Sequence, residues 1–312
     1  MFEIFAYLDG VNQRMKVLIF EYITASGEAS ESLAREGQMI LDALLSNFAK
    51  LPVEMIVATK NDFQNQLKTV DAIWLIAPEC DGILERFCRY VEHQNKQLLT
   101  SPAKAVALTA NKFSTFQILN AAQIQTVPTE IFNSVFNYDQ TKEWLIKPID
   151  GVGAENTFLL TSPKEWNNLP ALDKNYIIQP HLHGEKTSLS CLFKNGFARL
   201  VCVNVQIFEV IDQQYVLQNI KVNCKLDDGR YQKLVSEIAQ AFPDLFGYAG
   251  IDLIETENAC FVLEINPRLT TSFVGIEKAL GLNVAECVLE LLQCDVQKLK
   301  SYPNTLNVEI HV

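Results

Sequence analysis

Short apolar runs alternate with amphipathic segments along the N-terminal third of the chain. Runs typical of buried strands occupy residues 16–22, 53–59 and 71–77. Apolar positions at helical spacing predict helices over residues 35–50 and 81–95, and Asp81 is expected to cap the second of these. Residues 61–68 are interpreted as a short polar helix. Strands that alternate with helices imply a parallel sheet, so residues 15–100 are predicted to form an open parallel α/β domain. Residues 1–14 precede this domain and are interpreted as an N-terminal extension.

The pattern changes beyond residue 100. A helical segment at 111–122, an extended segment at 124–132 and strands at 144–149 and 176–179 indicate a second unit, residues 101–180. From residue 181, apolar strands are joined by short polar turns, which predicts antiparallel hairpins. These strands are residues 188–193, 198–206, 214–217, 250–255 and 259–265, with helices at 231–242 and 284–293. The chain is therefore predicted to be α/β in class, with α+β character in the units 101–180 and 181–312.

Composition and charge limit the kinds of partner that the protein is expected to bind. The net charge of −11 repels polyanions, so no nucleic-acid partner is expected. No apolar run reaches the roughly 18 residues of a membrane span, and the N-terminus lacks a signal-peptide pattern, so no membrane association is expected. The 8 cysteines form no C-x-x-C motif, and several lie in apolar strands. Reduced thiols of this kind predict a cytoplasmic protein.

The strongest chemical signal lies in two consecutive strands, residues 250–255 and 261–268. Asp252 and Glu264 are lone acids in apolar runs, and Asn266 shares the face of Glu264 because strand side chains alternate. A hairpin would bring these oxygen donors together as ligands for Mg²⁺ or Mn²⁺ beside phosphate oxygens. Arg268 would stabilise charge on a transferring phosphoryl group. The alternative is a surface hairpin whose polar side chains face water.

Two lysines are placed to bind phosphates. Lys147 ends an apolar strand that runs into a loop with Gly151 and Gly153, whose N–H groups would wrap phosphate oxygens. The alternative is an edge-strand lysine followed by a hairpin turn. Lys112 begins a helix upstream and would also reach phosphates, unless it is an ordinary solvated lysine of a first helical turn.

The segment 176–188 reads as a strand that ends at a hinge between two units. A nucleotide base would bond to backbone atoms near Gln179 and His181, with its ribose near Glu185. His181 and His183 face the same side of an extended chain, which raises the question of a zinc site. No third ligand lies nearby in sequence, so a surface or hinge role is expected for both.

In this order, the motifs resemble those of the ATP-grasp superfamily over roughly residues 17–290. The resemblance implies an ATP-grasp fold in which the N-terminal domain is followed by two subdomains that clamp ATP and Mg²⁺. It implies phosphate contacts from Lys112 and Lys147 and a metal site at Asp252, Glu264 and Asn266, with Arg268 near the γ-phosphate. It also implies a loop over the triphosphate that includes Gly151, Gly153, Ala154 and Asn156, and an adenine site at Gln179, Pro180, His181 and Leu182. The ribose would contact Glu185 or Lys186, and because Gln179 stands where the superfamily is usually acidic, only backbone contacts to adenine are carried over.

The N-terminal segments 20–27 and 33–41 resemble the tyramine–glutamate ligase group of methanofuran biosynthesis. Ligands of open α/β sheets bind beyond the carboxyl ends of the strands. Glu21, Ser26, Gly27 and Arg35 lie there and are therefore candidate substrate contacts.

The implied activity is an ATP-dependent carboxylate–amine ligase acting on two small molecules. A carboxylate would attack the γ-phosphate of ATP, and an amine would then attack the acyl-phosphate to give an amide. An amino-acid or dipeptide ligase and a non-catalytic ATP-binding regulator are the alternatives. The complete set of phosphoryl-transfer residues argues against the regulator, and a homodimer is left open.

Overall fold

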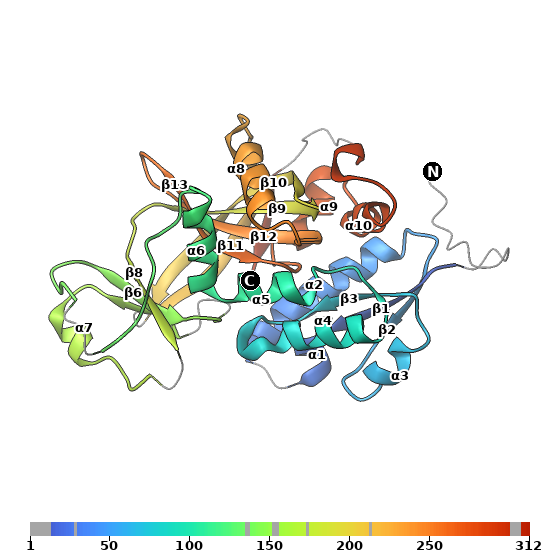
Figure 1. Ribbon diagram of the computed structural model, residues 1–312, viewed down its shortest axis with the longest axis horizontal. Coiled ribbons are helices and arrows are strands. Elements are labelled where there is room, and N and C mark those ends of the chain that lie inside the picture. The colour runs from blue at the N-terminus through green and yellow to red at the C-terminus, as the bar shows by residue number, and fades with distance from the viewer. Residues whose placement is uncertain are drawn as a thin grey trace.

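The computed structural model describes residues 14–27, 30–134, 138–151, 156–172, 175–211, 214–299 and 307–312, and of residue 214 the backbone only. Most of the predicted extension, residues 1–14, therefore lies outside the described residues. Within these ranges the strands form three sheets. Figure 1 shows a small sheet at one end of the molecule, a parallel α/β layer at the other, and a large sheet next to both.

The N-terminal sheet is parallel, as predicted, with strand order β2-β1-β3-β4. Its strands are β1 (Lys16–Glu21), β2 (Glu54–Val57), β3 (Ala72–Ile76) and β4 (Gln97–Leu98). Helix α2 (Glu31–Phe48) packs on one face against Val17, Ile19 and Trp74. The other face carries α3 (Phe63–Leu67), α4 (Ile83–His93) and α5 (Ala103–Ala110). Apolar residues fill both faces, which explains the continuous apolar runs of β1 and β3.

Two local expectations in this region are wrong. Asp81 does not cap α4: it has a φ of 52°, and Gly82 occupies the N-cap position without a side-chain hydrogen bond. Tyr22 starts a short helix, α1 (Tyr22–Ser26), instead of ending β1, because the Glu21 carboxylate accepts hydrogen bonds from the N–H groups of Ile23 and Thr24. A side chain that satisfies the first N–H groups of a helix fixes where the strand ends.

The small sheet is antiparallel, with strand order β5-β8-β6-β7. It consists of β5 (Glu130–Ile131), β6 (Trp144–Pro148), β7 (Phe158–Leu160) and β8 (Tyr176–Pro180), and α7 (Pro163–Asn167) lies beside it. Aromatic side chains pack around its small core, and the rings of Tyr138 and Trp166 stack 5.6 Å apart. Helix α6 (Lys112–Ala121) begins where Asn111 accepts a hydrogen bond from the N–H of Ser114.

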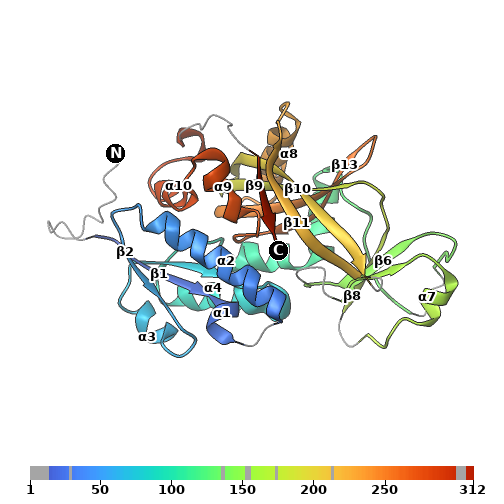
Figure 2. The same cartoon turned by 180° about the vertical axis from the view of Figure 1, so that it is seen from behind.

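The large sheet is antiparallel, with strand order β13-β12-β9-β10-β11-β14. Its strands are β9 (Glu185–Lys194), β10 (Phe197–Ile211), β11 (Gln214–Lys225), β12 (Gly247–Glu255), β13 (Cys260–Asn266) and β14 (Val308–His311). Helix α8 (Arg230–Ala241) covers one face, and α9 (Phe273–Leu280) and α10 (Val284–Leu291) cover the other. The sequence pattern missed β14 and underestimated β10 and β11, which form a hairpin that extends towards β6 and β8 (Figure 2).

One apolar core joins the N-terminal layer to the C-terminal helices. Ile40, Leu44 and Phe48 of α2 lie in the same cluster as Ile276 of α9 and side chains of α10. The contact is strengthened at its edge by Asn47, whose carbonyl oxygen accepts a hydrogen bond of 2.8 Å from the Asn283 side chain. The parallel layer and the large sheet therefore hold each other in place.

Replacing Leu44 by alanine tests this shared core. Leu44 is 0% exposed, so Leu44→Ala is expected to lower the free energy of unfolding by about 2–5 kcal/mol through lost burial and a new cavity. The matched control is Leu226→Ala, because Leu226 is 78% exposed and its loss is expected to change stability little. Urea unfolding measures both. Equal stability of the two variants would contradict a core that spans both parts.

Candidate active site

A cavity of about 360 Å³ lies between the small sheet, the large sheet and the start of α2. Its volume is within the range of small-molecule sites. The predicted residues that line it are Lys112, Lys147, Gly151, Asp252, Glu264, Asn266 and Arg268. Side chains from segments more than a hundred residues apart thus share one cavity.

The acidic side of the cavity is built by the pairing of β12 with β13. Asp252 lies directly opposite Glu264, and Gly250 lies opposite Asn266. The Asn266 amide donates a hydrogen bond of 3.0 Å to Asp252 Oδ2, and Gln206 of β10 donates one of 3.0 Å to Oδ1. These side chains face the cavity, so the alternative of a hairpin whose polar face lies on the outer surface is wrong.

The two carboxylates strongly influence each other's ionisation. Burial, together with the charge of Glu264, raises the pKa of Asp252 well above its usual range. Burial would also raise the pKa of Glu264, but the charges of Lys112 and Lys147 hold it below its usual range. Two crowded carboxylates beside an amide form a set of hard oxygen donors that fits a divalent cation such as Mg²⁺.

The basic side of the cavity is built by Lys147 and Lys112. Lys147 lies on β6, a central strand of the small sheet, which excludes the edge-strand alternative. Burial lowers its pKa to about 8, although the charge of Glu264 opposes the shift. Lys112 is only 8% exposed, and its ammonium lies 3.3 Å from Glu264 and donates a hydrogen bond of 2.5 Å to the Gly151 carbonyl oxygen. A solvated first-turn lysine is therefore excluded, and both cations face the cavity.

Arg268 follows β13, and a residue of the N-terminal layer fixes its side chain. Its Nε donates a hydrogen bond of 2.9 Å to Glu79, which lies beyond the carboxyl end of β3. Its Nη1 donates one of 3.2 Å to the Leu269 carbonyl oxygen. The ion pair fixes the guanidinium beside the cavity and links the parallel layer to the large sheet.

Most of the predicted residues of the glycine loop, 151–156, and of the hinge, 179–182, are not found at the cavity. Gly153 and Ala154 lie outside the described residues, while Asn156 is exposed with a φ of 54° and does not line the cavity. The Gln179 side chain is buried and donates a hydrogen bond of 2.8 Å to Thr129. None of the side chains of Gln179, Pro180, His181 and Leu182 lines the cavity.

The alternation of β9 separates the two candidates for a ribose contact. Glu185 forms an ion pair with Lys225, away from the cavity. Lys186 lines the cavity, and its ammonium lies 5.3 Å from the centre of the Tyr215 ring. Of these two residues, only Lys186 therefore lines the cavity.

The four candidate substrate contacts instead serve the local structure. Glu21 is buried and caps α1, the Ser26 hydroxyl bonds to the Ile23 carbonyl oxygen, and Gly27 ends α1 with a φ of 66°. Arg35 is exposed and lies 3.9 Å from Glu31. None of the four lines the cavity, which in this region is bounded by Ser30, Ser32, Leu33, Glu36, Thr271 and Ser272.

The position of Glu36 at the cavity could have been predicted from the sequence. Leu33, Glu36 and Ile40 share one face of α2 because they are spaced three and four residues apart. Glu36 is thus an acid on the face that packs inward, and its carboxylate accepts a hydrogen bond from Thr271. Helical periodicity would have selected Glu36 in place of the neighbouring Arg35.

Comparison with known proteins agrees with this geometry. The model of the ATP-grasp domain family matches residues 109–272, more than half of the chain, and that of the pre ATP-grasp 3 domain matches residues 34–106. The chain belongs to the ATP-grasp family. The predicted fold class is thereby confirmed, and so is the reaction class of an ATP-dependent carbon–nitrogen ligase. Enzymes of this family use ATP with Mg²⁺.

Three individual proteins are similar to the chain. The tyramine–L-glutamate ligase of Methanocaldococcus jannaschii is 25% identical over 84% of each chain. The tetrahydromethanopterin:α-L-glutamate ligase of the same organism is 28% identical over 64% of this chain and 71% of its own length. The crystal structure of an ATP-grasp superfamily protein from Archaeoglobus fulgidus superposes with a TM-score of 0.70 at 23% identity, covering 88% of each chain.

Among the described residues, every helix is too short or too polar to span a bilayer.

Substitution of the adjacent pair on β9 tests which residue faces the nucleotide. Lys186→Met is expected to weaken ATP binding about tenfold, because a hydrogen bond to a charged group is worth about 1.5 kcal/mol or more. Glu185→Gln is the matched control, since its side chain points to Lys225, and it is expected to leave ATP affinity nearly unchanged. Isothermal titration with a non-hydrolysable ATP analogue measures both. The reverse ranking would restore Glu185 as the ribose contact.

Proposed function

We propose that the enzyme activates the carboxylate of L-glutamate with ATP and transfers the acyl group to tyramine or a closely related amine, as in methanofuran-type cofactor biosynthesis. The relative that carries both names in its title matches this chain over 84% of each protein. Tyramine has an amine and no carboxylate, so in that pairing the activated acid is glutamate. The second relative is also named as a glutamate ligase, which supports glutamate as a substrate here.

The convergence of Asp252, Glu264 and Asn266 beside Lys112 and Lys147 carries the proposal. These three residues would hold Mg²⁺, which when bound neutralises phosphate charge and orients the triphosphate. Lys112 and Lys147 would bind phosphate oxygens as point charges. In the described structure the lysines compensate the charge of the acids. When Mg·ATP binds, the acids would face the cation and the lysines would face the phosphates.

The reaction would proceed without a covalent enzyme intermediate. A glutamate carboxylate oxygen attacks the γ-phosphorus, the bond to the β-phosphate bridging oxygen breaks, and ADP leaves. The amine nitrogen then attacks the acyl carbon, phosphate leaves with the electron pair of the acyl–oxygen bond, and the amine loses a proton. Arg268, whose Nε donates a hydrogen bond to Glu79, would stabilise charge on the transferring phosphoryl group.

The region of the cavity between α2 and the segment after β13 would bind the two small substrates. Hydroxyl groups there would donate to a carboxylate, and the Glu36 carboxylate would attract an ammonium group. These side chains are Ser30, Ser32, Glu36, Thr271 and Ser272. The mixture of one acid with several hydroxyl groups suits an amino acid, whose charged groups have both signs.

A substrate panel with one paired substitution tests the proposal. ADP release is expected to require an acid and an amine together, with glutamate and tyramine the fastest pair and the amide detected by mass. Glu264→Gln keeps the shape of the side chain but removes a metal-binding charge, so the turnover rate is expected to fall by roughly 100-fold or more.

Glu257→Gln is the control, because Glu257 is exposed in the turn of the same hairpin. It is expected to retain the normal rate. Equal rates for the two variants would refute the metal site. Faster turnover with pairs of amino acids would assign the enzyme to dipeptide synthesis, and ATP binding without any amide would show a non-catalytic regulator.

A further inference from the structure

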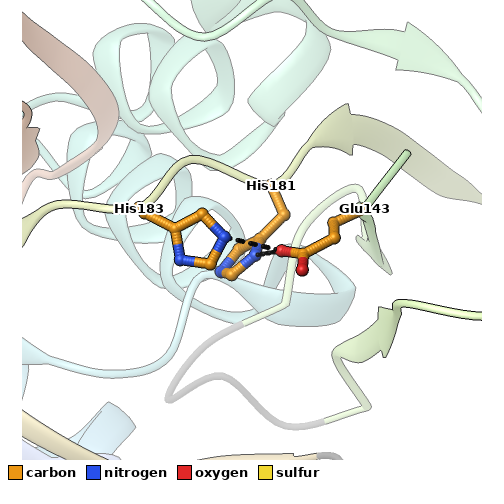
Figure 3. Close-up of side chains that lie close together, drawn as sticks. All are labelled: Glu143, His181 and His183. Atoms are coloured by element: carbon orange, nitrogen blue, oxygen red, sulfur yellow. Dashed lines mark hydrogen bonds and ion pairs between the residues drawn. The ribbon is translucent and has the colours of Figure 1, made fainter. Parts of the chain in front are cut away.

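A second cluster of metal-binding side chains lies at the hinge, apart from the acids of the cavity. Glu143 directly precedes β6, and His181 and His183 follow β8. Figure 3 shows both imidazoles turned towards the Glu143 carboxylate. Glu143 Oε2 lies 2.7 Å from His181 Nδ1 and 2.8 Å from His183 Nε2. The sequence offered only the two histidines, and the fold supplies the third residue.

We propose that Glu143, His181 and His183 bind one divalent transition-metal ion, most favourably Zn²⁺. One ligand atom from each residue lies within 4.8 Å of the other two. Two imidazoles and one carboxylate form a ligand set that zinc accepts with a water in the fourth position. His183 is 78% exposed, so solvent has access for that water and for entry of the ion.

The Glu143 carboxylate must move to admit the ion. Metal–ligand bonds of about 2.0–2.2 Å in a tetrahedron separate neighbouring ligand atoms by roughly 3.3 Å. The carboxylate oxygen would therefore retreat by roughly half an ångström from each imidazole. Since the Glu143 side chain is more than one-third exposed, it has room to do so.

Tyr215 provides the observation that points most directly to a metal ligand. His181 offers Nδ1 to the cluster, while its Nε2 lies 2.7 Å from the Tyr215 hydroxyl. A metal-binding histidine typically donates its other ring N–H to an oxygen, which fixes the tautomer and the ring orientation. Tyr215 is placed to accept that N–H, so the ring of His181 is already oriented for an ion at Nδ1.

The ligand chemistry of this cluster differs from that of the acidic site in the cavity. Imidazole ligands select transition metals, whereas the oxygen donors of Asp252, Glu264 and Asn266 select Mg²⁺, so the two sites bind different ions.

A bound ion would restrict movement of the small sheet relative to the large sheet. It would connect the start of β6 to the segment after β8, and through Tyr215 to the β10–β11 hairpin of the large sheet. Tyr215 also lines the main cavity. The ion would therefore fix the orientation of the small sheet next to the nucleotide site without touching the reacting groups.

Titration of the metal-free full-length protein with Co²⁺, in excess Mg²⁺, tests the proposal. Co²⁺ in a tetrahedral site with nitrogen ligands absorbs strongly in the visible range, whereas six oxygen ligands give weak absorption, so the readout separates the two sites. Wild type is expected to bind one Co²⁺ with strong absorption, which Zn²⁺ then displaces. His183→Ala and Glu143→Gln are expected to lose this signal, and Tyr215→Phe to weaken binding about 10- to 100-fold.

His93→Ala is the matched control, because it removes an exposed histidine outside the cluster. It is expected to bind Co²⁺ like wild type. The thermal unfolding midpoints of the metal-free variants establish that each is folded, and Zn²⁺ is expected to raise the midpoint of wild type but not that of His183→Ala. An unchanged signal in His183→Ala, or no strong absorption in wild type, would overturn the proposal.

Discussion

The antiparallel register of β12 and β13 is the constraint on which the site depends. It places the carboxylate of Asp252 beside that of Glu264, where like charges repel and burial penalises both. Removing either nearby lysine would leave part of this charge uncompensated, which is costly away from water. The pair is stable because Lys112 lies within 3.3 Å of Glu264 and Lys147 adds a second positive charge. A divalent cation bound between these carboxylates and phosphate oxygens would also compensate their negative charge.

Each structural layer contributes charged groups to this balance. The small sheet supplies Lys147, the large sheet supplies the acids, and the parallel layer supplies Glu79, which orients Arg268. The apolar core shared by α2, α9 and α10 holds the parallel layer against the large sheet, so the arginine keeps its position. Binding of substrates between the layers would therefore depend on packing far from the reacting atoms.

The sequence predicted the parts of the site that follow from strand periodicity. Asp252, Glu264 and Asn266 were predicted correctly to share a face, because side chains alternate and a short turn sets the pairing. Single-residue alternation also decides between Glu185 and Lys186, but that required knowing the register with β12. The local roles of Glu21 and Asp81 could not be predicted, because hydrogen bonds and backbone angles within one turn determine them. Glu143 was out of reach, since only the folded small sheet brings it to a histidine 38 residues away.

A crystal structure with Mn²⁺ and a non-hydrolysable ATP analogue, with the ion located by its anomalous scattering, tests the central claim most directly. The account predicts a Mn²⁺ ion roughly 2.1–2.3 Å from oxygen atoms of Asp252 and Glu264, with Asn266 in its shell and the triphosphate beside Lys147. Mn²⁺ bound elsewhere, or a triphosphate separated from Lys147 by the small sheet, would contradict it.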